Sequence, residues 1–322
     1  PYGNESLIAE IPEEQILFTG EMTHLPALRN FEEELRQKLD RPVGCDPLRS
    51  LVSGRDRVLI LVEDNTRNTP VRRILPVLLD YLQEAGVPLG NVEILTAPGT
   101  HRVMTEEELT EKIGREIAQK VKVSQHDFRE TETIVDLGAV RVGRSRIPVQ
   151  VNRKVLETDF LIGLGDIVPH SDAGFSGGAK IVQPGVSGEA TTGATHLLGC
   201  RARPSFLGQV ANPVRRELNA VARSARMNYI FNTVQNEFGR TVRAFFGDLE
   251  EAFLAAAFVA TSAFFVARPL ELDVYGAEAF FAALACWLFA GARAGGRCRW
   301  LFAAGLAAGL AWTVREQALC LI

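Results

Sequence analysis

The 322-residue sequence has a net charge of −4 at pH 7, with 47% hydrophobic and 23% charged residues. This length allows two domains, and the lack of a strong basic excess argues against a nucleic-acid-binding protein. The five cysteines include no CxxC pair, which favours reduced thiols in a cytoplasmic protein over a disulfide framework. The first residues do not have the pattern of a signal peptide.

Units of strand, polar loop and helix follow one another from residue 57 onward. The predicted strands are Arg57–Val62, an apolar strand of the buried parallel type, Val92–Ala97, and Phe160–Leu164, an apolar run typical of a buried strand. The helices that follow them are predicted over Val71–Ala85, from Thr105 to about Lys120, and over Ser187–Leu198. A capping box of Thr105 and Glu108 marks the start of the second helix, and Pro76 predicts a kink or a later start in the first. The repetition predicts an α/β fold with a Rossmann-like parallel sheet and helices on its faces.

Further elements are predicted to complete this first domain, which would span residues 1–248. They are a strand at Leu7–Ile11, a helix at Leu28–Leu39, short strands within 133–151, a helix from Asn212 to about Arg226, and a β-hairpin of Tyr229–Val234 with Thr241–Phe246. The Asn212-Pro213 pair is an N-cap and first-turn signal. The hairpin ends near Gly247, and the pattern of strands and helices ends with it.

The composition changes after residue 248. Every lysine lies at or before Lys180, and residues 252–267, 279–292 and 300–314 are nearly uncharged and rich in alanine. Each of these runs is shorter than the roughly 20 residues that span a bilayer, although together they resemble membrane hairpins. Residues 249–322 are therefore predicted to form a short hydrophobic α-helical tail. Two interpretations of this tail stay open: it contacts a membrane through residues 252–314, or it is a fusion artefact. The first domain is expected in the cytoplasm.

The three predicted strands each end in a loop that carries polar groups. Because the carboxyl ends of parallel strands meet at one edge of a sheet, these loops should converge there. The groups that they and the following helix bring are His101, His170, Lys180 and His196. Histidine suits both proton transfer and metal ligation. No HExxH or other metal-ligand pattern decides between the two roles.

Asp64 and Arg67 lie in the first of these loops, and each has two interpretations. They are either a helix-capping carboxylate and a solvated guanidinium, or a pair that recognises a phosphate or carboxylate. The loop that contains Lys180 is rich in glycine, which allows a close approach of the backbone to a ligand or a simple turn.

Three linked motifs resemble the nickel-dependent lactate racemase family. They are Asp-Asn-Thr-Arg-Asn-Thr-Pro at 64–70, Gly-Thr-His-Arg at 99–102, and the run from Pro169-His170 through Gly-Phe-Ser-Gly-Gly-Ala-Lys180 to Pro184-Gly185. The spacing from His170 to Lys180 and His196 also resembles that family, as does the N-terminal start at Tyr2-Gly3. The resemblance covers about residues 1–250, and Ala179 departs from it because a basic residue is common there.

The resemblance implies a nickel-pincer nucleotide as cofactor, tethered covalently through Lys180 and with His196 as the protein ligand of nickel. It implies that His101 and His170 are the paired acid–base groups. It further implies cofactor or substrate contacts by Asp64, Thr66, Arg67, Gly177 and Gly178.

The reaction implied by the resemblance is racemisation or epimerisation of a small, lactate-like 2-hydroxy acid. A histidine takes the hydroxyl proton while hydride passes to the cofactor, and the reverse transfer to the other face gives the opposite enantiomer. The implied partners are the hydroxy acid and the enzymes that synthesise the cofactor. A second α/β domain that closes the site in this family is not found in the sequence. The alternative is therefore a catalytically incomplete remnant that binds the nucleotide cofactor without turnover.

Overall fold

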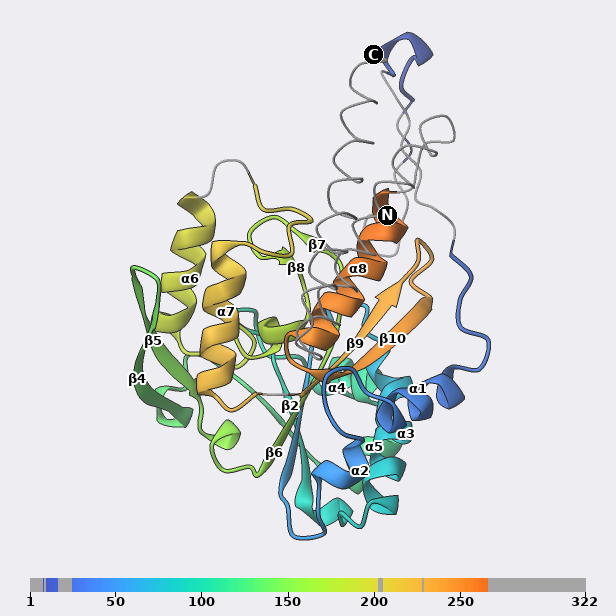
Figure 1. Ribbon diagram of the computed structural model, residues 1–322, viewed down its shortest axis with the longest axis vertical. Coiled ribbons are helices and arrows are strands. Elements are labelled where there is room, and N and C mark those ends of the chain that lie inside the picture. Colours follow the sequence, from blue (N-terminus) through green and yellow to red (C-terminus); the bar gives the residue numbers. More distant parts are fainter. Residues whose placement is uncertain (1–7, 9, 17–24, 202–204, 228, 266–322) are drawn as a thin grey trace, which may run out of the picture. The chain divides into compact units, whose positions relative to one another are not determined.

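The computed structural model describes residues 8, 10–16, 25–201, 205–227 and 229–265 (Figure 1). The chain divides into two compact units, residues 24–263 and residues 1–23 with 264–322. The described part of the second unit includes a short 3-10 helix, η1, Glu13–Gln15. The larger unit contains the elements that position the predicted site.

A six-stranded sheet with the order β10-β9-β6-β1-β2-β3 forms the centre of the larger unit. Its strands are β1 Val58–Val62, β2 Val92–Thr96, β3 Lys122–Gln125, β6 Phe160–Asp166, β9 Tyr229–Gln235 and β10 Thr241–Asp248. All neighbours pair in parallel except β10, which is antiparallel to β9. The predicted α/β class with a mainly parallel sheet is therefore confirmed.

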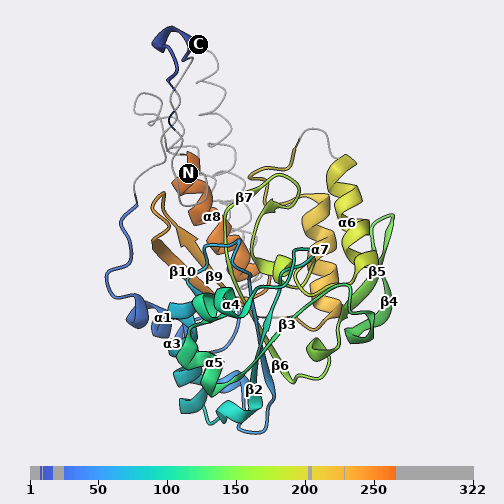
Figure 2. The ribbon, with the colours of Figure 1, turned by 180° about the vertical axis from the view of Figure 1, so that it is seen from behind.

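Helices cover this sheet, and two small hairpins lie outside it. The helices are α1 Phe31–Asp40, α2 Leu48–Leu51, α3 Val71–Glu84, α4 Glu106–Ile113, α5 Arg115–Lys120, α6 Glu189–Arg201, α7 Pro213–Ser224 and α8 Glu251–Phe265. The 3-10 helices are η2 Leu89–Asn91, η3 Thr131–Thr133, η4 Arg153–Val155 and η5 Gly178–Ile181. The hairpins pair β4 Ile134–Val142 with β5 Ser145–Asn152, and β7 Pro169–His170 with β8 Gly174–Phe175. Both views show α1 and α3 on one side of the sheet and α6, α7 and β4–β5 on the other (Figures 1 and 2).

The main hydrophobic core lies between the sheet and the side covered by α1 and α3. In α3 the apolar residues recur at helical spacing, and Val71, Ile74, Leu78 and Leu82 are all buried. Pro76 lies inside α3 without ending it, and the helix begins at Val71 rather than later. Burial of this stripe fixes the helix that follows the first site loop.

Two predicted elements differ from the structure, and one strand of the sheet was not predicted. The helix expected from Thr105 to Lys120 keeps its capping box but divides at Gly114, whose φ of 95° interrupts the helical backbone. Strand β3 was not predicted, because Lys122–Gln125 is polar and too short for a periodic signal. The strand expected at Leu7–Ile11 lies partly outside the described residues, and residues 8, 10 and 11 are not in a strand.

Helix α8 begins just after residue 248 and largely belongs to the compact unit of residues 24–263. It buries Ala252, Phe253, Ala256 and Ala260, and in both views it runs beside β9 and β10 (Figures 1 and 2). The division at residue 248 stays a prediction, and residues 266–322 lie outside the described part. Within residues 8–265 as described, no helix combines the length and apolarity needed to cross a membrane.

Candidate active site

A cavity of about 160 Å³ lies at the carboxyl ends of β1, β2 and β6, where the three polar loops were expected to converge. Six predicted residues line it: Asp64, Arg67, His101, His170, Lys180 and His196. Thr66 contacts the cavity residue Asp64 from the same loop. Gly177 and Gly178 are buried beneath the cavity wall instead of lining it. The parallel sheet thus brings together side chains that are far apart in the sequence.

Asp64 and His101 form a hydrogen-bonded pair between the first two loops. The Asp64 Oδ2 atom lies 2.7 Å from His101 Nδ1, and the carboxylate is buried while the imidazole is half-exposed. The other carboxylate oxygen accepts hydrogen bonds from the Thr66 hydroxyl at 2.6 Å and the Thr66 N–H at 3.2 Å. A carboxylate only accepts, so His101 carries a proton on Nδ1 and its Nε2 has a free lone pair.

Helix α4 holds the first two loops in place through the partly buried side chains of Lys112 and Glu108. The Lys112 ammonium donates to the carbonyl of Arg67 at 2.6 Å and more weakly to that of Thr69 at 3.4 Å. Glu108 accepts from the side chains of Asn65 in the first loop and Arg102 in the second, and from the N-cap backbone of its own helix. Asp64 and His101 therefore sit on loops that are tied to one rigid element.

His170 and Lys180 contact each other in the third loop. The distance from Lys180 Nζ to His170 Nε2 is 3.0 Å. On the other side of the ring, Nδ1 accepts from the backbone N–H groups of Asp172 at 3.1 Å and Ala173 at 3.3 Å. Because Nδ1 accepts, the proton of the neutral ring is on Nε2. The Nε2–H group then donates to Lys180, which is therefore an uncharged amine in this arrangement.

The pKa directions of this pair agree with the geometry. Burial, together with the positive charges of Arg215 and Arg67, lowers the pKa of Lys180 to about 8. Burial also lowers the pKa of His170 to about 4, with Lys180 as the second cause. Both groups are therefore held in their uncharged forms near neutral pH more readily than in water.

His101 and His170 are consequently not equivalent. His101 presents a lone pair at Nε2 and has a buried carboxylate behind Nδ1. His170 presents a proton at Nε2 and has two backbone N–H groups behind Nδ1. The first arrangement is that of a proton acceptor, and the second is that of a hydrogen-bond donor.

His196 is oriented as a metal ligand. It lies on α6, and its Nδ1 donates to the Thr192 carbonyl one turn earlier at 2.8 Å. This bond places the proton on Nδ1 and leaves the Nε2 lone pair for a ligand bond, which is the usual tautomer of metal-bound histidine. Among the described residues, no group of three or more histidine, cysteine or acidic side chains could hold a metal ion.

Glycine is required at two positions of the third loop by close packing. Gly177 has a φ of 66°, and a Cβ atom there would lie 2.7 Å from the Asp166 carbonyl oxygen. Gly178 has a φ of 58°, and its Cβ would lie 2.8 Å from the ring of Phe253. Close packing thus accounts for glycine at both positions, and a contact of Gly177 and Gly178 with a cofactor stays a prediction.

The sequence did not reveal two buried carboxyl groups beside the site. Glu63 lines the cavity, and Asp166 ends β6; both are more than nine-tenths buried. Burial raises the pKa of Glu63 to about 8, and the charge of Asp166 adds to that shift. Both residues looked like ordinary polar flanks of apolar strands, and only the position of Glu63 directly before Asp64 could have drawn attention to it.

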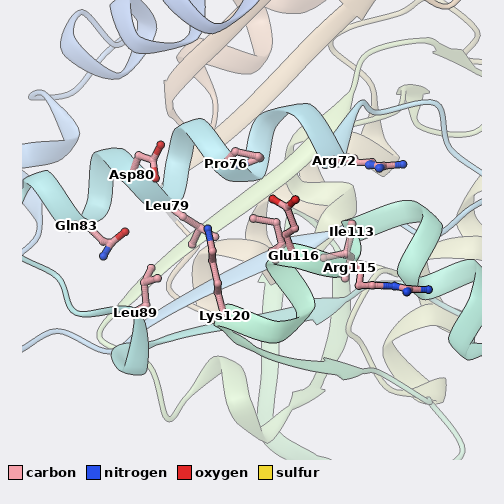
Figure 3. Close-up of a pocket in the computed structure, with 12 residues that line it drawn as sticks. Arg72, Pro76, Leu79, Asp80, Gln83, Leu89, Ile113, Arg115, Glu116 and Lys120 are labelled. Atoms are coloured by element: carbon pink, nitrogen blue, oxygen red, sulfur yellow. The ribbon is translucent and has the colours of Figure 1, made fainter.

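A larger cavity, of about 390 Å³, lies away from these groups (Figure 3). It is lined from α3 and from the segment around α5, with Pro76, Leu79 and Lys120 among its side chains. None of the predicted site residues lines it. The smaller cavity is the better candidate, because histidines, a lysine and buried carboxyl groups with shifted pKa values meet there.

Comparisons with known proteins show that the chain is similar to lactate racemases. Residues 2–207 match the family model of the lactate racemase N-terminal domain. The chain is 30% identical over 281 residues to the lactate racemase of Thermoanaerobacterium thermosaccharolyticum, covering 85% of this chain and 65% of that protein. It is 32% identical over 260 residues to the lactate racemase of Lactiplantibacillus plantarum, covering 78% and 59%.

The fold is also found in solved structures. The lactate racemase apoprotein of T. thermosaccharolyticum superposes with a TM-score of 0.71 at 29% identity, over 82% of this chain and 61% of that one. A protein from Thermotoga maritima superposes with a TM-score of 0.61 at 25% identity, over 71% and 59%. The chain thus spans less than two thirds of the length of these relatives.

Proposed function

We propose, because the chain belongs to the lactate racemase N-terminal domain family, that it binds a nickel-pincer nucleotide and racemises or epimerises a small 2-hydroxy acid. The observation that carries the proposal is the pair of unlike histidines, His101 and His170, at one cavity with Lys180 and His196. One histidine presents a lone pair that can accept the hydroxyl proton, and the other presents an N–H group that can donate a hydrogen bond to the substrate oxygen.

The residues present fit the proposed cofactor. Lys180 offers a partly buried amine whose charged form is disfavoured by its surroundings and which can be thioacylated to a thioamide, and His196 offers a lone pair at Nε2. A single imidazole with the remaining ligands supplied by the cofactor agrees with the donor set of the described residues. When bound, the nickel-pincer nucleotide supplies the acceptor and donor of hydride.

His101 is proposed to accept the hydroxyl proton at Nε2. The imidazolium that forms is stabilised by Asp64, which is buried and already bonded to Nδ1 at 2.7 Å. Thr66 donates two hydrogen bonds to the same carboxylate, so it keeps Asp64 facing the histidine. Asp64 and Thr66 therefore act by positioning a base, which differs from the direct cofactor contact that the sequence resemblance implied.

His170 is proposed to hold its proton at Nε2 and to donate a hydrogen bond from it to the substrate oxygen. The backbone N–H groups of Asp172 and Ala173 occupy Nδ1 and disfavour protonation there. For His170 to act as a base on the opposite enantiomer, these two N–H groups must release Nδ1. Arg67, which lines the same cavity, is positioned to pair with a substrate carboxylate or a cofactor phosphate.

Lys180, His196, His101 and His170 are all present. This complete set favours the proposed function over a remnant that binds cofactor without turnover. The activity, the hydroxy acid and the supply of cofactor by its synthesis enzymes are all part of the proposal. Membrane contact through residues 252–314 also stays a proposal, and most of that segment lies outside the described residues.

The test is co-expression of the chain with the cofactor-synthesis enzymes, followed by intact mass and metal analysis. Lys180→Ala should abolish the covalent adduct, whereas His196→Ala should keep the adduct and lose nickel, because an imidazole can only ligate. Lys120→Ala, which removes an exposed lysine, is the matched control and should load normally. An adduct on Lys180→Ala, or equal nickel in wild type and His196→Ala, would show that the assignment is wrong.

A further inference from the structure

Arg215 on α7 is a buried cation that holds the site loop from beneath. Its Nη1 donates to the Gly177 carbonyl at 3.1 Å, and its Nη2 donates to the carbonyls of Phe175 and, at 3.4 Å, Ala173. The residue is 3% exposed. Among the described residues, no carboxylate forms an ion pair with it. The three carbonyls lie in the segment between His170 and Lys180, so one guanidinium spans the loop that carries both groups.

Phe253 of α8 completes this support. Its ring centroid lies 4.1 Å from the Arg215 guanidinium carbon, which is a cation–π contact in a desolvated place. The same ring packs against Gly178, where a Cβ atom would lie 2.8 Å away. The first turns of α8 therefore contact both the guanidinium and the loop, although this helix follows residue 248.

Lys180 is surrounded by more positive than negative charge. His170 contacts its amine at 3.0 Å. Arg215 from α7 and Arg67 from the loop after β1 disfavour the ammonium form, whereas Asp172 and Glu63 favour it more weakly. A buried arginine keeps its charge because of its very high intrinsic pKa, even where burial lowers that pKa.

We propose that Arg215 is a positioning residue that fixes the loop between His170 and Lys180 and disfavours the charged form of the Lys180 amine, so that the amine is acylated more readily. The inference rests on the proposed function only for the identity of the acyl group. Acylation forms a bond from Nζ to the acyl carbon, breaks the bond from that carbon to its leaving group, and releases a proton from nitrogen. Phe253 serves the same role by covering the face of the guanidinium.

The test measures the reactivity of Lys180 in the full chain with acetic anhydride, whose acetate leaves as the amide forms. Peptide mass spectrometry follows acetylation of Lys180 across pH 6–10, relative to exposed Lys120 in the same sample. Wild type should reach half of its maximal rate near the pKa of about 8. Arg215→Met should move that midpoint upward by at least about half a pH unit, because a nearby positive charge is lost. The matched control is Arg216→Met, on the exposed side of the same helix, and it should leave the midpoint unchanged.

Arg215→Lys separates charge from simple loss of structure. It keeps a positive charge but lacks the planar fork that reaches several carbonyls, so its midpoint should stay near that of wild type. Equal midpoints in wild type and Arg215→Met would overturn the proposal. Equal upward shifts in Arg215→Lys and Arg215→Met would also overturn it, because they would indicate a structural role only. If Arg215→Met does not fold, the other two variants test the proposal. Arg215→Lys should keep the midpoint of wild type, and Phe253→Leu should raise it.

The same samples distinguish this inference from the proposed function. If Lys180 shows the expected profile and dependence on Arg215 but takes no adduct from the cofactor-synthesis enzymes, the proposed function fails and the inference stands. If the adduct forms equally on wild type and Arg215→Met, the inference fails and the proposed function stands.

Discussion

Replacing Asp64 by asparagine should reverse the protonation of His101 without changing the shape of the site. Thr66 donates both its hydroxyl and its N–H to one oxygen of residue 64. An asparagine must therefore turn its carbonyl oxygen toward Thr66 and its NH₂ group toward His101 Nδ1. The Nδ1 atom of His101, which lies 2.7 Å from the Asp64 carboxylate in the native chain, then has to accept a hydrogen bond from this NH₂ group. The His101 proton moves to Nε2, and the proposed base is lost.

The expected loss of activity follows from the role of a positioned base. General bases contribute roughly 10²–10⁴-fold to rate, and His101 is half-exposed, so solvent can partly replace the carboxylate. We therefore expect about a 10²-fold decrease in the interconversion of D- and L-lactate by the cofactor-loaded chain. Chiral chromatography measures this rate. Asp80→Asn, an exposed replacement on α3, is the control and should retain full activity.

A second measurement tests the tautomer directly and does not depend on activity. In a chain with ¹⁵N-labelled histidine, the ring nitrogens of neutral His101 should report a proton on Nδ1 in wild type and on Nε2 in Asp64→Asn. The His101 signals are identified by their loss in His101→Gln. A proton that stays on Nδ1 in Asp64→Asn would refute the hydrogen-bond reasoning, whatever the effect on rate.

Two further predictions concern buried groups near the site. Burial lowers the pKa of His126 to about 4, so the unfolded chain takes up its proton first as the pH falls. The free energy of unfolding should therefore decrease from about pH 6.5 to pH 4, by at most about 1.4 kcal/mol per pH unit. Urea unfolding should show this slope reduced in His126→Gln. Glu63 changes the free energy of unfolding in the opposite direction with pH. Its pKa is about 8 in the folded chain, so the buried carboxyl group stays protonated while the unfolded chain loses that proton. Its contribution to stability is therefore complete below pH 4.5 and is lost as the pH rises to 8. Glu63→Gln should therefore gain stability relative to wild type between pH 5 and pH 8, and no gain in denaturant titrations would contradict the assignment of a protonated Glu63.

The convergence of the site residues could be predicted from the sequence because it depends on strand direction. Predominantly apolar segments that alternate with polar loops and helices indicate parallel strands, and the loops after such strands meet at one edge. His101, His170 and Lys180 needed no further information to be placed together. His196 needed only the helix that follows the third loop. The different protonation of His101 and His170 could not be predicted, because it depends on which atom faces Nδ1 of each ring.

The supporting residues were hidden by their local patterns. Arg215 and Arg216 are adjacent on an amphipathic helix, and only the packed structure shows which of the two is buried. Glu63 looked like a solvated flank of β1, but it is buried and contacts Asp166 at the end of β6 and Thr69 in its own loop. Phe253 lies in an alanine-rich stretch whose composition indicated a separate tail, whereas its ring packs on Arg215. In each case a long-range contact decides burial, and no short sequence window contains it.

The order of the central sheet also limits when the site can form during synthesis. Strand β1 pairs with β2 on one edge and with β6 on the other, and β6 follows about 100 residues later, as the link from Arg57 to Asp159 shows with its separation of 102 residues. A nascent chain that ends before β6 leaves one edge of β1 unpaired, and Val58–Val62 is apolar throughout. Unpaired apolar edges promote association between chains. The interval between translation of β1 and β6 is therefore when this protein most needs a chaperone.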